Sequence, residues 1–497
     1  MDKYLDTIFD EVDPNIKLDT QQKEVVLDNS DNIIVVAGAG SGKTTTITAK
    51  IKYLVDIKKV REEEILVISF TNKAIYELQE RINIDFKIKA KICTFHKFAY
   101  DILKKHDSKY RILSEPKSVM KEIIKKDEET NKIIKVLLKD KKYKKRSSKY
   151  NSDKEYFINF TLENIQLYKM CDFKQVNISN KRVSCYFNYL EKITQKYNNH
   201  LRKNYMLDFE DIIIEATKIV NKVPLKYKYI IVDEYQDISY NRFELIRKIS
   251  QLYKIKTIVV GDDWQAIFSF AGSNSNLFLN YKEIMNAQMH KIVNTYRNSQ
   301  QLIDIAGNFI MASKEQLEKK LISSKTMKFP IEIYEYKKDI NEILIKVLDK
   351  IIKENGLNRN ILILGRYNMD IKLLVSNKIH INKNKVVYKK YPSLKIDFMT
   401  VHAAKGLGYD NVILINMLND VYGFPSKIEN DDIKKQLINN QRNSLEERRL
   451  FYVAITRTKN KVYILAKKGK ESEFIIEISK NDNVYYERKK TKKNRQS

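Results

Sequence analysis

Short runs of Ile, Val and Leu recur along the chain, and longer stretches with apolar residues at every third or fourth position separate them. Strands buried in a parallel sheet consist of nearly continuous apolar residues, whereas the helices that connect them show a 3.6-residue period. The alternation therefore predicts an α/β fold, in which helices cover parallel sheets. The expected strands are 33–36, 65–69, 92–94, 229–232, 257–260, 361–364, 396–400, 412–416 and 462–465.

One long stretch departs from this alternation. Between residues 98 and 207 no strand-like run occurs, and the apolar residues follow a helical period instead. The stretch includes the basic cluster 139–146, which suits a solvated helix face as well as a DNA contact. We therefore expect a helical insertion within the first lobe. With 497 residues the chain has room for several domains, because one domain typically takes about 100–200 residues.

The charge balance narrows the class of partner. The formal net charge is +29, which predicts a polyanionic partner and, by default, nucleic acid. Basic residues that only solvate the surface are the alternative. No stretch reaches the roughly 18 apolar residues that span a bilayer, and the N-terminus does not resemble a signal peptide. We therefore expect a cytoplasmic protein with no membrane partner. The three cysteines lack CxxC spacing, so neither a zinc site nor a disulfide framework is indicated.

A glycine-rich loop follows the first predicted strand and precedes a predicted helix. Backbone N–H groups of such a loop, together with the helix N-terminus, surround phosphate oxygens. Lys43 adds a positive charge, and the Thr44 hydroxyl is placed to bind Mg²⁺. The loop comprises Ala37, Gly38, Ala39, Gly40, Ser41, Gly42, Lys43 and Thr44, with Ala37 in place of the first glycine of the usual pattern. The sequence therefore predicts a nucleoside triphosphate site.

Paired carboxylates follow the predicted strand 229–232. They fall at the carboxyl edge of the sheet, where open α/β sheets bind ligands. Asp233 is expected to hold Mg²⁺, and Glu234 to orient and deprotonate the attacking water. An Asp-Glu pair alone would more often be a solvated strand end, but the phosphate loop upstream favours catalysis.

Nine motifs occur in order along the chain, and through them it resembles the UvrD/Rep/PcrA-like superfamily 1 DNA helicases, with features of the helicase-IV-like branch. The segments are 18–22 (LDTQQ), 68–74 (ISFTNKA), 94–96 (TFH), 208–211 (DFED), 260–265 (VGDDWQ), 294–297 (NTYR), 365–368 (GRYN), 400–407 (TVHAAKGL) and 446–457 (EERRLFYVAITR). Each motif is modest evidence alone, but chance does not supply nine in this order.

The resemblance assigns roles at the nucleotide site, with ATP and Mg²⁺ as cofactors. Gln265 would sense the γ-phosphate. Guanidinium groups from the second lobe would stabilise charge on the transferred phosphoryl group. The implied catalytic residues are Lys43, Asp233, Glu234, Gln265, Arg297 and Arg457. The implied nucleotide-binding residues add Gln22 at the adenine edge, Tyr296 on the adenine face, Thr45 and the loop residues named above, and the metal ligands are Thr44 and Asp233.

The resemblance also assigns contacts with single-stranded DNA. Aromatic rings stack on bases without regard to sequence, because every base has a π-face. Core packing is the alternative for each phenylalanine, and a role as a satisfied core histidine is the alternative for each histidine. The implied DNA-binding residues are Phe70, Thr71, Asn72, Thr94, His96, Phe268, Phe270, Arg366, Asn368, Thr400 and His402.

The family fold implies two RecA-like lobes. We expect the first lobe in two parts, 1–102 and 208–285, with the helical insertion at 103–207 between them. The second lobe is expected at 286–480 and a basic, disordered tail at 481–497. Only 33 residues, 367–399, separate the Arg366 motif from Thr400, so the domain that full-length relatives insert there is expected to be absent. Thr45 and Gly408 stand where many relatives have an adenine-packing Arg and a ribose-contacting Glu.

The resulting hypothesis is an ATP-dependent 3′–5′ translocase on single-stranded DNA that unwinds tailed duplex DNA. The direction rests on the resemblance alone. The alternative is a DNA-sensing ATPase subunit that regulates a nuclease, a repair protein or an anti-phage defence partner without processive unwinding. An RNA translocase is a third reading, because nothing in the sequence determines recognition of the 2′-OH.

Overall fold

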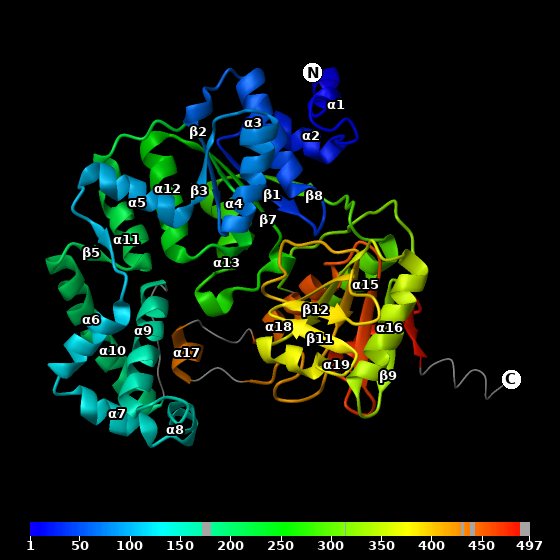
Figure 1. Ribbon diagram of the computed structural model, residues 1–497. Helices are drawn as coiled ribbons and strands as arrows, with labels where there is room; N and C mark the ends of the chain where they lie inside the picture. Colours follow the sequence, from blue (N-terminus) through cyan, green and yellow to red (C-terminus); the bar gives the residue numbers. More distant parts are fainter. Residues whose placement is uncertain (171–179, 314, 429–431, 438–442, 488–497) are drawn as a thin grey trace.

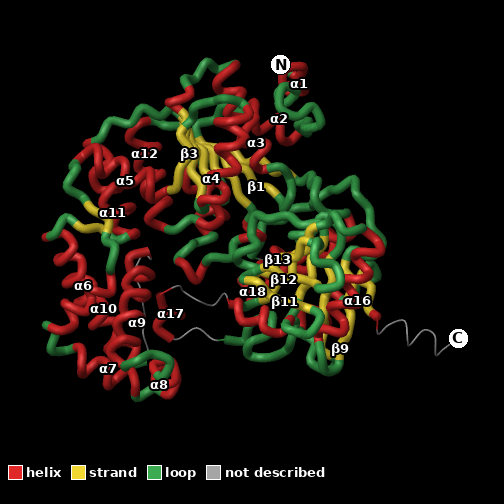
Figure 2. Tube along the Cα trace, viewed as in Figure 1, coloured by secondary structure: helices red, strands yellow, loops and turns green. Residues whose placement is uncertain are grey.

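Two α/β lobes and one helical subdomain make up the protein (Figure 1). The structure is a computed structural model, and it describes residues 1–170, 180–313, 315–428, 432–437 and 443–487. Each lobe is built on one large sheet, and helices pack against the sheets (Figure 2). No helix in these described ranges is long and apolar enough to cross a membrane.

The first sheet has six parallel strands in the order β3-β2-β6-β7-β1-β8. Its strands are β1 (Asn32–Ala37), β2 (Ile65–Ser69), β3 (Lys91–Thr94), β6 (Tyr229–Val232), β7 (Lys256–Gly261) and β8 (Gln288–Ile292). The five strands expected from the sequence are all present. Side chains of β1 alternate between two cores, because Ile33 and Val35 pack on one face and Ile34 and Val36 on the other.

The edge strand β8 did not appear among the predicted strands. It pairs with β1, so the first sheet extends beyond residue 286, where the second lobe was expected to begin. Gln288, His290 and Lys291 interrupt its apolar character, because an edge strand buries fewer of its side chains. The helices of this lobe are α1 (Asp2–Thr7), α2 (Thr20–Leu27), α3 (Lys43–Asp56), α4 (Asn72–Gln79), α5 (Phe95–His106), α11 (Phe209–Ile219), α12 (Tyr240–Tyr253), α13 (Asn276–Leu279) and α14 (Tyr281–Met285).

The insertion is helical, as the periodicity predicts. It contains α6 (Pro116–Lys125), α7 (Thr130–Leu138), α8 (Lys141–Ser147), α9 (Asp153–Met170) and α10 (Lys181–Lys203), and a short parallel pair, β4 (Arg111–Ile112) and β5 (Met206–Leu207), closes its base. The insertion has its own core. Ile433 and Leu437 of α17 (Asp432–Leu437) are buried in that core, although α17 lies between elements of the second lobe in the sequence (Figure 1).

The second sheet has eight strands in the order β11-β12-β13-β10-β14-β15-β9-β16. They are β9 (Ile331–Tyr336), β10 (Asn360–Gly365), β11 (Ile379–Asn382), β12 (Lys385–Tyr388), β13 (Lys395–Thr400), β14 (Asn411–Leu414), β15 (Val462–Lys467) and β16 (Val484–Tyr486). Only the pairs β11/β12 and β12/β13 are antiparallel. Residues 367–399 contain one 3₁₀ helix, the hairpin β11/β12 and the start of β13, so no inserted domain is present there.

Two features of the second lobe differ from expectation. The strand β9 reads IEIYEY, and its alternating glutamates hide a buried strand from a search for continuous apolar runs. The strand β16 lies within the predicted tail 481–497 and pairs with β9, so the expectation of disorder is wrong for 484–486; residues 488–497 lie outside the described residues. The remaining helices are α15 (Gln300–Met311), α16 (Ile340–Asn355), α18 (Asn443–Ile455) and α19 (Glu473–Ile478).

Candidate nucleotide and DNA sites

The loop between β1 and α3 has the backbone that phosphate binding needs. Gly40 and Gly42 adopt φ angles of 72° and 80°, which glycine adopts without steric cost. A Cβ on Gly40 would lie 2.5 Å from the Arg297 Cβ, so the loop also depends on glycine for its close approach to the second lobe's connecting segment. Ser41 Oγ is buried and has no hydrogen-bond partner among the described residues. A phosphate would supply the missing acceptor.

A cavity of about 460 Å³ opens beside this loop, and both lobes line it. Predicted residues that line it are Gly38, Gly40, Ser41, Gly42, Lys43, Thr44, Thr45, Asp233, Glu234, Gln265, Tyr296, Arg297 and Arg457. These residues come from five separate segments of the chain, so the fold brings together residues of several predicted motifs.

The adjacent carboxylates Asp233 and Glu234, which both line this cavity, differ in their pKa values. Burial and the neighbouring Glu234 raise the pKa of Asp233 to about 7. Burial acts to raise the pKa of Glu234 as well, but Lys43 and Lys405 outweigh it and lower that pKa. The Lys43 Nζ lies 3.4 Å from Glu234 Oε1. Glu234 therefore stays ionised near neutral pH and can act as a base, whereas Asp233 loses its proton readily when a cation approaches.

The Glu234 backbone is strained. Its φ angle is 53°, in the left-handed region that few non-glycine residues adopt. Such strain costs of order 1–3 kcal/mol, and it concentrates at functional sites. The side chain is held by Gln236, whose Nε2 donates to Glu234 Oε2 at 2.5 Å. The structure thus fixes this carboxylate in one direction, toward the phosphate loop.

Two arginines face the phosphate loop from the second lobe and its connecting segment. Arg457 is fully buried, and its Nη2 donates to Gln265 Oε1 at 2.9 Å. Burial and the neighbouring Arg297 lower the pKa of Arg457 to about 9. Arg297 donates to the Thr456 carbonyl at 3.5 Å. Arg297 and Arg457 repel each other, and a triphosphate between them would offset that repulsion.

Three of the predicted nucleotide residues lie outside the cavity. Ala37 and Ala39 are buried in the loop backbone. The Gln22 side chain is also buried, and its Nε2 donates to the Ser41 carbonyl at 3.0 Å while its Oε1 accepts from Asp19 N. In the structure Gln22 therefore supports the phosphate loop, and its contact with adenine stays a prediction. Tyr296 is half exposed, and its hydroxyl donates to the Asp19 carboxylate at 2.9 Å.

Further residues of the cavity were missed by sequence reasoning. They are Ala74, Glu77, Arg81, Lys325, Gly406 and Lys459. Arg81 Nη1 lies 3.5 Å from Thr45 Oγ1, so it brings a guanidinium to the position where Thr45 replaces the arginine of many relatives. No motif marked Arg81, because it lies 36 residues from Thr45 in the sequence.

A second, largely apolar cavity of about 280 Å³ lies next to the first. Phe70, Thr71, Phe268 and His402 line it, and all four were predicted DNA contacts. Phe270 is 51% exposed beside it, with its ring centroid 5.3 Å from that of His402. An exposed aromatic ring next to an apolar groove can stack on a nucleic acid base.

Several predicted DNA contacts also have local roles in the structure. Thr71 and Thr94 cap helices α4 and α5 through their hydroxyls, and Thr400 Oγ1 accepts from Ala403 N. Asn72 and Asn368 are exposed. Burial, and then a neighbouring cation, lowers the pKa of His96 and of His402 to about 4. Both imidazoles are therefore neutral near pH 7 and offer hydrogen bonds to a strand rather than charge.

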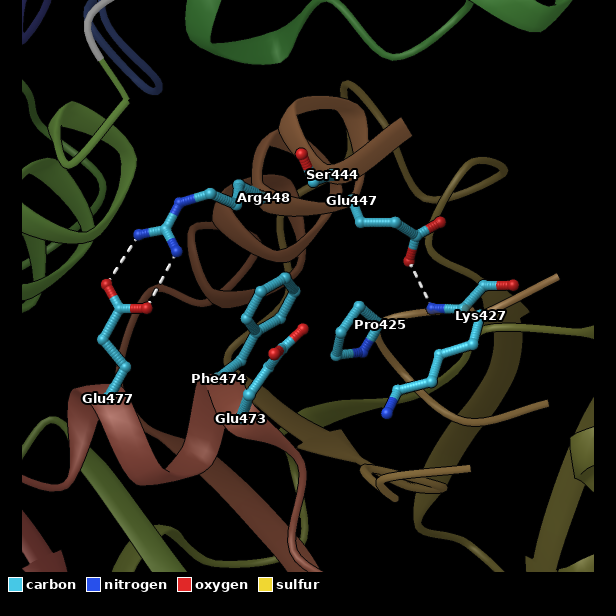
Figure 3. A pocket seen from close by; sticks show the side chains of 9 residues that line it. Pro425, Lys427, Ser444, Glu447, Arg448, Glu473, Phe474 and Glu477 are labelled. Carbon is cyan, nitrogen blue, oxygen red and sulfur yellow. Dashed lines mark hydrogen bonds and ion pairs between the residues drawn. The ribbon is translucent and has the colours of Figure 1, made fainter. Parts of the chain in front are cut away.

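Arg366 is already paired. Its guanidinium contacts Glu447 of α18 at 2.7 Å, and Glu447 also accepts from Ser426 N. Figure 3 shows Glu447 beside Arg448, which pairs with Glu477 instead. A DNA phosphate would therefore share the Arg366 guanidinium with Glu447.

One lysine connects the two cavities. Lys405 Nζ lies 2.5 Å from Asp237, 3.7 Å from Glu234 and 2.8 Å from the Gln265 carbonyl oxygen. It also lies 5.2 Å from the centre of the Phe268 ring. Lys405 belongs to the second lobe, whereas its partners belong to the first. Lys405 is therefore a direct neighbour of Glu234, which faces the phosphate loop, and of the aromatic groove.

Comparisons with known proteins agree with this arrangement. The model of the UvrD/REP helicase N-terminal domain matches residues 18–288, and that of the UvrD-like helicase C-terminal domain matches residues 378–469. DNA helicase IV of Escherichia coli K12 is 27% identical over 510 aligned positions, which cover 95% of this chain and 71% of that protein.

Two further relatives are matched over part of their length. The ATP-dependent DNA helicase Rep of Buchnera aphidicola is 30% identical, covering 72% of this chain and 56% of that protein. The ATP-dependent DNA helicase PcrA of Staphylococcus aureus is 27% identical, covering 72% of this chain and 49% of that protein. The chain thus spans about half the length of these two. The match to the N-terminal domain model covers more than half of the chain, and the chain belongs to the UvrD/REP family of superfamily 1 DNA helicases.

Proposed function

We propose that this protein is an ATP-driven 3′–5′ translocase on single-stranded DNA that unwinds tailed duplexes. The observation that carries the proposal is the shared boundary of the two cavities, because Glu234 lines both and Lys405, which lines the apolar groove, lies 3.7 Å from Glu234. A strand in the apolar groove would shift Lys405, and that shift would change the electrostatic surroundings of Glu234. Hydrolysis and strand movement would therefore be coupled. The direction is taken from the helicases that the chain resembles.

The nucleotide cavity supports hydrolysis through its own residues. Loop N–H groups and Lys43 would bind the β- and γ-phosphates. The Thr44 hydroxyl and the Asp233 carboxylate suit Mg²⁺, which would neutralise developing charge on the phosphates. Glu234 would take a proton from the attacking water, because its lowered pKa keeps it ionised. Gln265, Arg297 and Arg457 would contact the γ-phosphate once the lobes close on it.

The strongest alternative is a protein that hydrolyses ATP but does not translocate along DNA or unwind it. A DNA-sensing subunit would hydrolyse ATP in response to DNA and pass the signal to a nuclease or repair partner. Strand displacement on a duplex with a 3′ tail separates the two, with Glu234→Gln as the inactive control. The proposal expects ATP-dependent release of the shorter strand by wild type. DNA-stimulated hydrolysis without release would favour the regulatory subunit.

Replacing Phe270 with alanine is expected to weaken binding to single-stranded DNA. Stacking of one base is worth about 1–3 kcal/mol, which corresponds to a loss of roughly fivefold or more in affinity. Leu252→Ala is the matched control, because Leu252 is similarly exposed (48%) and lies on α12. Fluorescence anisotropy with a labelled oligonucleotide measures both. A loss below about twofold for Phe270→Ala would indicate that this ring serves packing instead.

The protein is expected to use dATP nearly as well as ATP. Gly408 offers no carboxylate for the ribose, and a Cβ at this position would lie 3.4 Å from Arg297 Nε. A hydrogen bond to a charged acceptor is worth about 1.5–3 kcal/mol when present, so its absence removes most of the sugar discrimination. Steady-state kinetics with both nucleotides give the ratio of kcat/KM. A tenfold preference for ATP would show that another group recognises the ribose.

A further inference from the structure

Lys319 is a buried lysine that the proposed mechanism does not use. Its Nζ lies 2.5 Å from Asp262 Oδ1 and 2.6 Å from Asp263 Oδ1, and all three side chains have 0% exposure. The same Nζ lies 4.5 Å from the centre of the Trp264 ring. Removing the ammonium group would leave two carboxylates in the interior without this cation, which is strongly destabilising.

This triad joins two parts of the chain with different roles. Lys319 lies between α15 and β9, in the segment that connects the first sheet to the second. Asp262 and Asp263 begin the turn that carries Gln265. Two further hydrogen bonds fix the same contact, because Trp264 Nε1 donates to the Leu317 carbonyl at 3.0 Å and Leu317 N donates to Asp263 Oδ2 at 2.8 Å.

Asp262 also contacts Gln265, which lines the nucleotide cavity. Its Oδ2 accepts from Gln265 Nε2 at 2.5 Å. The amide nitrogen of Gln265 is thereby occupied, so its Oε1 faces Arg457. With the opposite amide orientation Gln265 would present a donor to Arg457, which has no acceptor to offer it. The Asp262 carboxylate therefore selects the amide orientation that is compatible with Arg457.

A second Asp-Lys-Asp triad has a buried lysine and one buried carboxylate, Asp208, while the Asp211 side chain is 13% exposed. Lys169 Nζ lies 2.7 Å from Asp208 and 2.7 Å from Asp211, and 5.1 Å from the centre of the Tyr197 ring. It joins α9 of the insertion to the start of α11. Lys169 is not among the described residues that line either cavity. It serves as an internal reference for the structural cost of losing a buried Asp-Lys-Asp group.

We infer that Lys319 is a positioning residue for hydrolysis, which fixes the Gln265 amide through Asp262 and ties its orientation to the segment between the lobes. The inference rests on the proposed ATP hydrolysis. Gln265 would then contact the γ-phosphate in the required orientation only while the connecting segment packs against the turn formed by residues 262–264. Movement between the lobes would then be transmitted to the reacting phosphate through a single buried lysine.

The test compares Lys319→Met with Lys169→Met, two changes that each remove one buried ammonium group. Both variants are expected to lose thermal stability. Per folded molecule, Lys319→Met is expected to lose at least 30-fold in the kcat of ATP hydrolysis, with KM for ATP within threefold of wild type. Lys169→Met is expected to keep kcat within threefold. Equal kcat values in the two variants would overturn the inference, whereas an inactive wild type would overturn the proposed function instead.

Trp264 gives a second readout, because it is the chain's one tryptophan. Binding of a non-hydrolysable ATP analogue should change its emission in the wild type through Gln265, Asp262 and Lys319. The response should fall at least threefold in Lys319→Met at analogue concentrations that calorimetry shows to be saturating. An unchanged response would contradict the inference. If Lys319→Met does not fold, Asp262→Asn weakens the same link while keeping the Lys319–Asp263 pair. This variant is expected to lose tenfold in kcat. An unchanged kcat in Asp262→Asn would refute the link.

Discussion

Lys43→Ala is expected to reduce ATP hydrolysis to less than about one-hundredth of the wild-type rate, since loss of one preorganised charge contact costs about 10²–10³-fold. The same change removes the cation that contacts Glu234 at 3.4 Å, and nucleotide affinity should fall with the rate. DNA affinity should be unchanged, because Lys43 does not line the apolar groove as the structure describes it. Lys52→Ala, on the same helix, is the control and is expected to retain the wild-type rate.

Glu234→Gln separates binding from chemistry at the same cavity. The amide keeps the size of the side chain but cannot accept a proton from water, so turnover should fall at least 100-fold while a fluorescent nucleotide still binds. Hydrolysis within threefold of the wild type would contradict the assignment of Glu234 as the base.

Arg457→Ala is expected to have the second large effect. A guanidinium that stabilises phosphoryl transfer is worth about 10³–10⁵ in rate. We expect a loss of at least 100-fold in kcat, because Arg297 remains as a second cation. Arg448→Ala is the matched control, since Arg448 lies on α18, pairs with Glu477 (Figure 3) and is not among the described residues that line the nucleotide cavity. It should keep kcat within threefold. Similar losses in both variants would point to damage of the second lobe rather than to catalysis.

Much of the fold could be predicted from the chain because buried parallel strands leave a clear pattern. All nine expected strands exist, in two separate sheets. The strands that escaped prediction are those with one exposed or polar side. For example, β8 lies at a sheet edge, and β9 buries Glu332, which is held by Lys350 and Lys461. A buried glutamate with two lysine partners cannot be recognised before those partners are placed beside it.

The sequence predicted those parts of the site whose interacting residues are neighbours within one motif. The phosphate loop and the Asp233–Glu234 pair are local, and both appear where expected. Lys319 and Asp262 are 57 residues apart in the sequence, and Lys405 and Asp237 are 168 apart, so no spacing rule indicated either contact. For Gln22 the motif predicted an adenine contact, whereas the structure shows its side chain in other hydrogen bonds. Its motif was clear, but the capping box with Asp19 and the Ser41 carbonyl occupy its amide.

Displacement of streptavidin from biotinylated single-stranded DNA distinguishes a translocase from a DNA-stimulated ATPase, because it reports movement along one strand without a duplex. We expect ATP-dependent displacement from the 5′ end at a rate at least tenfold above the spontaneous rate, little displacement from the 3′ end, and none with Glu234→Gln. Hydrolysis of ATP that responds to DNA without displacement from either end, or with displacement from the 3′ end alone, would contradict the proposed function.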